Sequence, residues 1–460
     1  MSENTLKKEN IMGTLPVKQL LVKMSVPVIL SMLVSTLYNV VDSIFVSRLG
    51  ESALTAMSLG TPVSSLIACV TVGFSVGMNA VLSKRLGEGD REAADKAAGN
   101  GLLIEWICFA IFFLFGLFAV RFYYSMQTDI EEIRELGIQY TSIICLFSFG
   151  VANQVMLERM LVATGRSIGS MYSLLTGTLV NLILDPLLIF GLFGFPALGM
   201  RGAAIATVAA QHAAALVGLI FNLKTNKEIH FSKDMFKPQA DIMKGIFRVG
   251  FPAALQQSIS PMLIFGMNQI LLQFTSIAPA VYVIYVRLQS IVLIPVWGLK
   301  NTVVSIISYN YGAGLKERIQ ETMKICVIAT IVITLIGLAV FQLMPQALLG
   351  MFNAQGEVFD IGIRALRIVS FVFPFSGMTL LFGAFFQALG HSSKTLFTSV
   401  MQLCIMLASA FLLSRIGTVN TVWFAFIITE VIVAGISTLF LMAISRSTLQ
   451  FMKPYQPELA

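Results

Sequence analysis

The sequence has little charge for its length. Only 12% of its 460 residues are Asp, Glu, Lys or Arg, whereas 56% are hydrophobic and the mean hydropathy is +0.82. Soluble domains carry about 25% charged residues, so this chain has too few to cover a globular surface. A soluble enzyme, a secreted disulfide scaffold and a disordered polymer are therefore excluded for the chain as a whole. What remains is a polytopic membrane protein.

The sequence also lacks the common patterns of catalysis and ligand binding. Its five Cys lie singly in apolar runs, its three His are far apart, and it contains no GxGxxG, Walker A or HExxH pattern. Lys and Arg do not form runs interleaved with aromatic residues, which argues against nucleic acid. We therefore expect no enzyme activity, no firmly bound metal, no cofactor and no direct use of ATP.

Long apolar runs are what the sequence does contain. A bilayer core of about 30 Å needs about 20 apolar residues in a helix, and we find twelve such segments. They cover residues 20–47, 53–83, 95–122, 136–163, 168–192, 200–223, 245–274, 279–308, 320–345, 360–388, 394–415 and 419–446.

The distribution of Lys and Arg predicts the orientation and the domains. Most of them fall on one side if the N-terminus is cytoplasmic, and cytoplasmic loops carry the excess of these residues. We expect a multi-pass protein of the cell membrane with both termini in the cytoplasm. The predicted parts are a cytoplasmic segment 1–19, an N-lobe 20–223, a cytoplasmic linker 224–244, a C-lobe 245–446 and a cytoplasmic tail 447–460.

The two halves repeat with one offset of 225 residues. Pro27 matches Pro252, and Ala163-Thr-Gly-Arg-Ser167 matches Ala388-Leu-Gly-His-Ser392. Because each half has six helices, both enter the membrane in the same direction. The fold class is therefore an all-α membrane protein of twelve helices, in two six-helix lobes related by a parallel repeat, with a substrate path between them.

Acidic residues inside the bilayer are costly and usually functional. The halves differ here: Asp42, Glu158 and Asp185 of the first half correspond to Met267, Gly383 and Ala410 of the second. This asymmetry predicts that ion coupling lies in the N-lobe. Five acids lie within predicted helices: Asp42, Glu105, Glu158, Asp185 and Glu430.

Helical spacing brings two of these acids next to polar neighbours. Asn39 and Asp42 share a face, and Asn181 lies one turn before Asp185. The alternative for Asp42 is an interfacial residue near a helix end. The alternative for Asp185 is a cap, because Asp before Pro186 is typical of the start of a new half-helix. A helix broken there would also suit an ion site.

Other residues allow structural interpretations as well. Glu158 at a helix end would pair with Arg166, and Thr207 alone is an ordinary helix hydroxyl that bonds back to its own helix. For Glu105 and Glu430 a structural pair is favoured, with Lys300 as a guessed partner of Glu430. Pro27 makes a bendable point in the first helix, although proline is also common in membrane helices.

The chain resembles the multidrug and toxic compound extrusion (MATE) transporters, most closely the DinF or MepA-like branches. The resemblance covers nearly the full length. It rests on the two sets of six helices, Pro27 and Asp42 in the first, Asn181-Leu-Ile-Leu-Asp-Pro186 in the fifth and Gly202-Ala-Ala-Ile-Ala-Thr207 in the sixth. The chain departs from the branch that uses a glutamate in helix seven, where it reads Gln256-Gln257-Ser258.

This resemblance implies an antiporter that exports cationic amphiphilic compounds in exchange for H⁺ or Na⁺. It places Asp42, Asn181, Asp185 and Thr207 in an N-lobe polar network, with Glu158 where relatives carry another polar group. It also implies that the first helix bends near Pro27 when the network is protonated. The carboxylates would hold either a proton or a sodium ion, the latter at Asp42, Asn181 and Asp185.

The remaining expectations concern the substrate, its alternatives and the partners. We expect Asp42, Tyr38, Asn39 and Asn153 to contact substrate, and we expect a monomer whose partners are amphiphilic cations and membrane lipid. A lipid-linked sugar flippase or another metabolite exporter of the same superfamily is the alternative. It would need a basic cavity, and only Arg159, Arg287 and Lys300 are basic inside the helices. An intramembrane enzyme using Asp42 and Asp185 is a third possibility.

Overall fold

The computed structural model describes residues 10–275, 277–352 and 354–449. The side chains of Asn39, Val40, Ser43, Ser47 and Leu449 lie outside this description. The regular elements of the described residues are helices. The helices of the first half are α2 Ile11–Thr14, α3 Val17–Ser47, α4 Glu51–Glu88, α5 Arg91–Phe118, α6 Val120–Gln127, α7 Glu131–Leu146, α8 Phe149–Ala163, α9 Ser167–Phe190 and α10 Met200–Thr225. Those of the second half are α11 Ala240–Leu271, α12 Ala278–Gly312, α13 Lys316–Leu343, α14 Pro345–Gly350, α15 Glu357–Ser370, α16 Phe373–Ala388, α17 Ser392–Ile416, α18 Val419–Val422 and α19 Phe424–Ile444.

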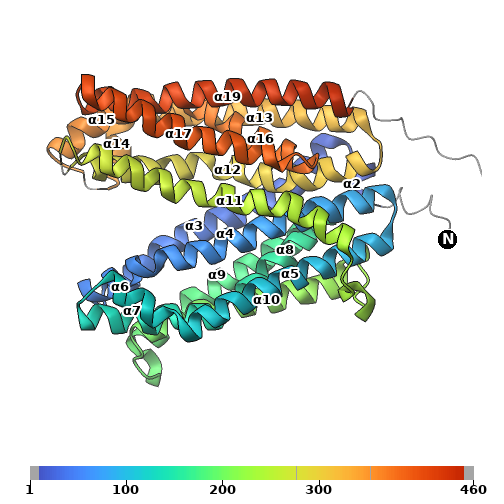
Figure 1. Cartoon of the computed structure of the whole chain (residues 1–460), viewed down its shortest axis with the longest axis horizontal. Coiled ribbons are helices and arrows are strands. Elements are labelled where there is room, and N and C mark those ends of the chain that lie inside the picture. The colour runs from blue at the N-terminus through green and yellow to red at the C-terminus, as the bar shows by residue number, and fades with distance from the viewer. Residues whose placement is uncertain (1–9, 276, 353, 450–460) are drawn as a thin grey trace, which may run out of the picture.

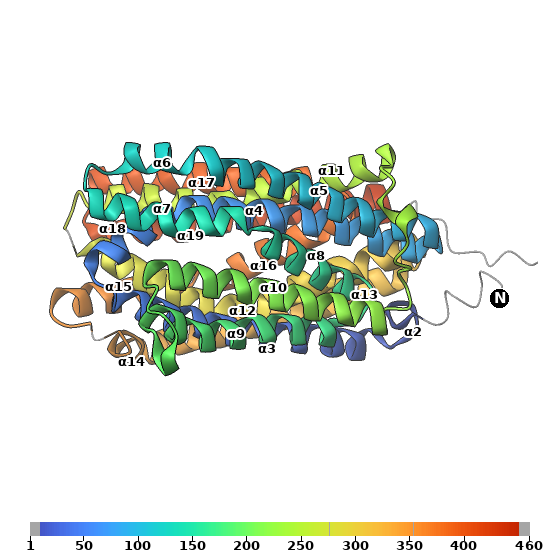
Figure 2. The same ribbon diagram turned by 90° about the horizontal axis from the view of Figure 1, so that it is seen from below.

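The long helices account for the twelve predicted membrane spans. Within the described residues, nine helices are long and apolar enough to cross a bilayer, and two bent pairs, α7 with α8 and α15 with α16, qualify together. The remaining span is α11, which has 32 residues but carries Gln256, Gln257, Ser258 and Ser260 in its middle. The two six-helix lobes, α3 to α10 and α11 to α19, are confirmed and form two bundles side by side (Figures 1 and 2).

The sequence repeat is also a structural repeat. Helix α9 begins at Ser167 and α17 at Ser392, which differ by the same 225 residues as the matched sequences. The Ser83 hydroxyl donates to the Ala163 carbonyl at 3.2 Å, and its counterpart Ser308 donates to Ala388 at 3.0 Å. The equivalent glycines adopt the same left-handed conformation: φ is 81° and 71° at Gly89 and Gly314, and 82° and 78° at Gly165 and Gly390.

Two spans that the sequence predicted as single segments are broken. Helices α7 and α8 meet at 45°, and α15 and α16 meet at 51°. The second bend lies at Phe371-Val372, directly before α16, whose Pro374 cannot donate the hydrogen bond that would continue α15. The first bend, at Phe147-Ser148, lies at the matching place in the repeat without a proline. The bend is therefore a property of the shared architecture.

The lobes meet closely at the end of the molecule that holds α2 and the linker between α10 and α11 (Figure 1). Here α4 packs along α11 and α12. A Cβ at Gly73 would collide with Ala254, and one at Gly77 with the backbone of Ile246 and Gly250. Hydrogen bonds also cross between the lobes, from Ser25 to Thr302 at 2.6 Å and from Ser305 to Asn79 at 2.9 Å.

Candidate functional site

Two helices of the N-lobe bring four of the predicted polar residues together. Tyr38 and Asp42 lie one turn apart on α3, Asn181 and Asp185 lie one turn apart on α9, and these helices pack against each other. The Tyr38 hydroxyl donates to Asp185 Oδ2 at 2.5 Å, and Asn181 Nδ2 donates to Asp185 Oδ1 at 2.9 Å. Asp185 is 0% exposed, so this carboxyl is enclosed by protein.

The carboxyls of Asp42 and Asp185, one on each helix, lie close enough to interact electrostatically. Two ionised carboxylates at such a separation repel each other, and a proton shared between them relieves the repulsion. Tyr140 of α7 lies close enough to interact electrostatically with both carboxyls. A single tyrosine at this position carries no sequence signal of such a contact. A paired-carboxyl arrangement of this kind can hold one proton.

Helix α9 does not break at Pro186. It runs from Ser167 to Phe190 and ends at Gly191, whose φ of 72° lies in the left-handed region. The expectation of a new half-helix starting at Asp185 is therefore wrong. Proline removes one hydrogen bond, and neighbouring helices in a membrane bundle tolerate that loss. Asp185 acts from inside a continuous helix, with its carboxyl directed at α3.

Glu158 lies apart from this pair. Its carboxyl accepts hydrogen bonds from Gln154 at 3.2 Å and from Ser173 at 3.0 Å. Ser173 precedes Asp185 by twelve residues on α9, which corresponds to roughly 18 Å of helix. The structure thus does not bring Glu158 into the Asp42–Asp185 pair.

Two other predicted residues make local contacts. The Thr207 hydroxyl bonds back to the Ala203 carbonyl of its own helix at 3.0 Å. The Asn153 side chain donates to the Phe149 carbonyl at 2.8 Å and accepts from Trp106 at 3.2 Å. Their proposed contacts with an ion or a substrate stay predictions.

The first helix contains the predicted hinge. Pro27 lies inside α3, which is continuous from Val17 to Ser47. Residues on either side of Pro27 contact the C-lobe. Ser25 is hydrogen-bonded to Thr302, and Ile29 packs so closely on Gly298 that a Cβ there would collide with it. The predicted site residue Asn39 has its side chain outside the described part of the chain.

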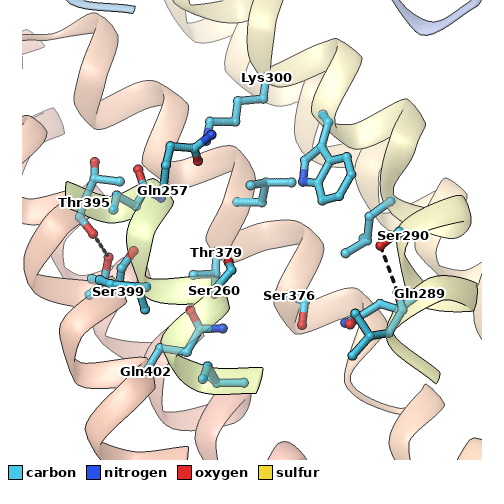
Figure 3. A pocket seen from close by; sticks show the side chains of 18 of the residues that line it. Gln257, Ser260, Gln289, Ser290, Lys300, Ser376, Thr379, Thr395, Ser399 and Gln402 are labelled. Atoms are coloured by element: carbon cyan, nitrogen blue, oxygen red, sulfur yellow. Dashed lines mark hydrogen bonds between the residues drawn. The ribbon is translucent and has the colours of Figure 1, made fainter. Parts of the chain in front are cut away.

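A cavity of about 700 Å³ opens between the lobes, mainly in the C-lobe (Figure 3). Its polar lining consists of side-chain amides, hydroxyls and three charged groups. These residues are Gln256, Gln257, Ser260, Gln289, Ser290, Asn301, Ser376, Thr379, Gln387, Thr395, Thr398, Ser399, Gln402, Arg159, Lys300 and Glu430. Apolar walls are supplied by residues such as Trp297, Tyr282 and Leu293.

The charged groups of this cavity do not form the guessed Lys300–Glu430 pair. Glu430 is 4% exposed, and its Oε1 accepts a hydrogen bond from Gln402 instead. Lys300 lies close enough to Arg159 for the two positive charges to repel. Within the residues that the structure describes, no ion pair includes either cation.

The spacing of the acidic residues gives no indication of this cavity. Its signal was nevertheless in the sequence. Gln256 and Ser260 are one turn apart on α11, and polar residues on one face kept that helix from qualifying as an apolar span. A polar face on a membrane helix points to the bundle interior or to a water-filled space.

Comparison with known families agrees with this architecture. The MatE family matches residues 27–187 and 252–412, one block in each lobe, and the blocks differ by the repeat offset. The chain belongs to the MatE family. Its members are transporters, so this chain is a multi-pass membrane transporter.

Three similar proteins illustrate the relationship. "Multidrug export protein MepA" of Staphylococcus saprophyticus is 25% identical over 412 residues, which cover 89% of this chain and 90% of the relative. A protein of Shewanella oneidensis named "FAD transporter" is 26% identical over 433 residues, or 93% and 94% of the two chains. A solved structure described as "MATE in the straight conformation" is 25% identical with a TM-score of 0.88, covering 98% of this chain and 99% of the other.

Proposed function

We propose that this MatE transporter is an antiporter that exports amphiphilic compounds by alternating access, with the Asp42–Asp185 pair as its coupling site. The observation that carries the proposal is the enclosed carboxyl pair of the N-lobe, hydrogen-bonded by Tyr38 and Asn181. The C-lobe has Met267 and Ala410 at the matching positions of the repeat. This asymmetry supports the proposal that coupling belongs to the N-lobe.

The contacts of Asp185 favour a proton over sodium as the coupling ion. A sodium site needs several oxygen atoms directed at one point. Here the two Asp185 oxygens accept bonds from the Tyr38 hydroxyl and the Asn181 amide nitrogen. Donors that satisfy a carboxylate compete with a metal ion, whereas a carboxyl pair holds one proton between its members. Protonation of the pair also changes the bonds between α3 and α9, which links it to the shape of α3 around Pro27.

The inter-lobe cavity is the proposed substrate chamber. Its aromatic and aliphatic walls suit amphiphilic molecules, and Glu430 supplies a carboxyl oxygen, Oε2, that has no hydrogen-bond partner in the described structure. That oxygen offers a place for the positive group of the cationic substrates that the sequence predicted. The relative named FAD transporter favours a second candidate, export of a metabolite, which the choice of substrate in the assay distinguishes.

The remaining parts of the proposal concern the setting. We place the protein in the cell membrane as a monomer, with both termini in the cytoplasm, surrounded by lipid. It needs no cofactor beyond the coupling ion and performs no covalent chemistry. Lobe contacts at the end near α2 would then close the cytoplasmic side in the conformation described here.

Transport by purified protein in lipid vesicles tests the proposal. A fluorescent lipophilic cation is loaded, and a pH gradient and a sodium gradient are imposed separately. We expect the pH gradient alone to drive export, and Asp42→Asn and Asp185→Asn to abolish gradient-driven export. Glu105→Gln is the matched control, since Glu105 is also a buried carboxyl of the N-lobe, on α5. Its export should stay near the wild-type rate.

Two results would contradict this proposal. Export by both Asp variants at the wild-type rate would remove the carboxyl pair from coupling. Export driven by sodium at constant pH, lost in the same variants, would keep the site but assign it the other ion.

A further inference from the structure

The inner part of the cavity contains two cations from opposite lobes. Arg159 comes from α8 of the N-lobe and Lys300 from α12 of the C-lobe, and both line the cavity. Their like charges interact. Glu158 directly precedes Arg159 in the chain and interacts with it electrostatically, but its Oε1 accepts hydrogen bonds from Gln154 and Ser173. The cavity is therefore lined by two half-buried cations within electrostatic reach of each other, and neither has an ion-pair partner among the described residues.

Such an arrangement is costly without a compensating charge. Partly buried cations lose hydration, and a like charge nearby adds repulsion. The same arrangement is favourable around an anion, because Arg and Lys both donate charge-assisted hydrogen bonds to phosphate and carboxylate oxygens. Neutral donors lie alongside: Lys300 extends toward Gln257 of α11 in Figure 3, and Asn301 follows it on the cavity wall.

The cation pair lies far from the acid of the same cavity. Glu430 interacts with Tyr285 of α12. Lys300 follows Tyr285 by fifteen residues, which corresponds to roughly 22 Å along the helix. Trp297 lies one turn from Lys300 and offers an apolar surface beside it. The cavity therefore has a negative part and a positive part, with apolar wall between them.

We propose that Arg159 and Lys300 form a binding subsite for the anionic group, a phosphate or a carboxylate, of an amphiphilic substrate. This inference rests on the proposed function of the cavity as the export chamber. The apolar body of the substrate would lie along Trp297 and the neighbouring wall. The substrates of this transporter thus include organic anions and zwitterions in addition to the cations predicted from the acidic residues.

The subsite also connects the substrate with the conformational change. Its two cations belong to different lobes, so an anion between them bridges the lobes at their closed end. A ligand shifts a conformational equilibrium toward the state that it binds better. An anionic group would therefore stabilise the conformation described here, and it would lose one of its two partners when the lobes separate at this end.

Binding of naphthalene derivatives to the purified full-length protein in nanodiscs tests the subsite. The probes are naphthyl phosphate, naphthoate, neutral naphthol and naphthylmethylammonium, followed by their fluorescence at constant ionic strength. The variants are Lys300→Gln, Arg159→Gln and the charge-conserving Lys300→Arg. Arg287→Gln is the matched control, because Arg287 is an exposed cation of the same helix and does not line the cavity.

We expect the two glutamine variants to bind naphthyl phosphate and naphthoate roughly ten- to hundredfold more weakly, the loss of a hydrogen bond to a charged group. Lys300→Arg and Arg287→Gln should bind within about threefold of wild type, and naphthol should be affected by none of them. Equal affinity of wild type and both glutamine variants for the anions would overturn the subsite. Competition by inorganic phosphate as strong as that by naphthyl phosphate would show a site for free phosphate and overturn the amphiphile assignment.

The vesicle assay separates this inference from the proposed function. If a pH gradient drives export of a cation and Lys300→Gln leaves anion binding unchanged, antiport stands and the subsite falls. If no gradient drives transport of any probe and anion binding still depends on Lys300, the subsite stands as a binding site and the antiport proposal falls.

Discussion

Two glycines of the repeat hold the lobes together, and filling either one should open the closed end. A Cβ at Gly87 of α4 would fall on the carbonyl oxygen of Tyr309, and one at Gly312 of α12 would fall on that of Lys84. Tyr309 and Lys84 are themselves separated by the repeat offset, so the two contacts are equivalent across the lobe interface. Both obstacles are backbone atoms, which cannot move aside as a flexible side chain can.

The expected size of the effect follows from these contacts. Inserting a methyl group into a well-packed site costs typically 1–3 kcal/mol. The collision exists only while α4 and α12 are in contact, so its free energy acts on the conformational equilibrium and not on each lobe alone. Gly87→Ala or Gly312→Ala should therefore change the ratio of the two conformations about 5- to 150-fold toward the state in which this end is open.

Distances between spin labels at the opposite end of the lobes measure this shift. Met126 of α6 and Met351 after α14 are both 73% exposed and occupy equivalent places in the repeat. With the accessible native cysteines replaced, labels at these two positions should move closer together in each alanine variant. Gly435→Ala is the control, because a Cβ at Gly435 of α19 meets no atom within 4 Å. Distance distributions of Gly87→Ala and Gly312→Ala that match those of Gly435→Ala would refute the reasoning.

Two further predictions concern stability. Glu105 is 1% exposed, and both of its carboxyl oxygens lack a well-placed hydrogen-bond partner in the described structure. Glu105→Met should therefore raise the unfolding temperature by an amount equivalent to about 1–3 kcal/mol. An unfolding temperature below that of the wild type would contradict this. Burial, helped by Lys394 and Arg248, lowers the pKa of His391 in the loop before α17. Because the unfolded chain then binds the proton more readily than the folded chain, the free energy of unfolding should be highest above the ordinary His pKa. It should decrease as the pH falls below that value. Thermal unfolding should show a weaker decrease in His391→Gln, and an unchanged pH profile would exclude this residue as a cause.

The acidic cluster shows how far spacing along the chain can lead. Asn181 and Asp185 are four residues apart, and a helix places them on one face wherever it lies. That Asp185 meets Tyr38 and Asp42 depends on α3 packing against α9, which no local pattern encodes. Glu158 illustrates the reverse case, since it was grouped with the aspartates by its chemistry and the fold separates it from them by roughly 18 Å along α9.

The sequence by itself determined the twelve spans, the two lobes and the parallel repeat. These follow from hydropathy and from one constant offset, which are properties read along a single chain segment at a time. The tertiary structure alone decided the break between α15 and α16, the unbroken course of α9 and the meeting of Arg159 with Lys300 across the lobes. Such contacts depend on how helix faces pack in three dimensions, and residues 141 positions apart in the chain share no periodic relationship that would reveal them.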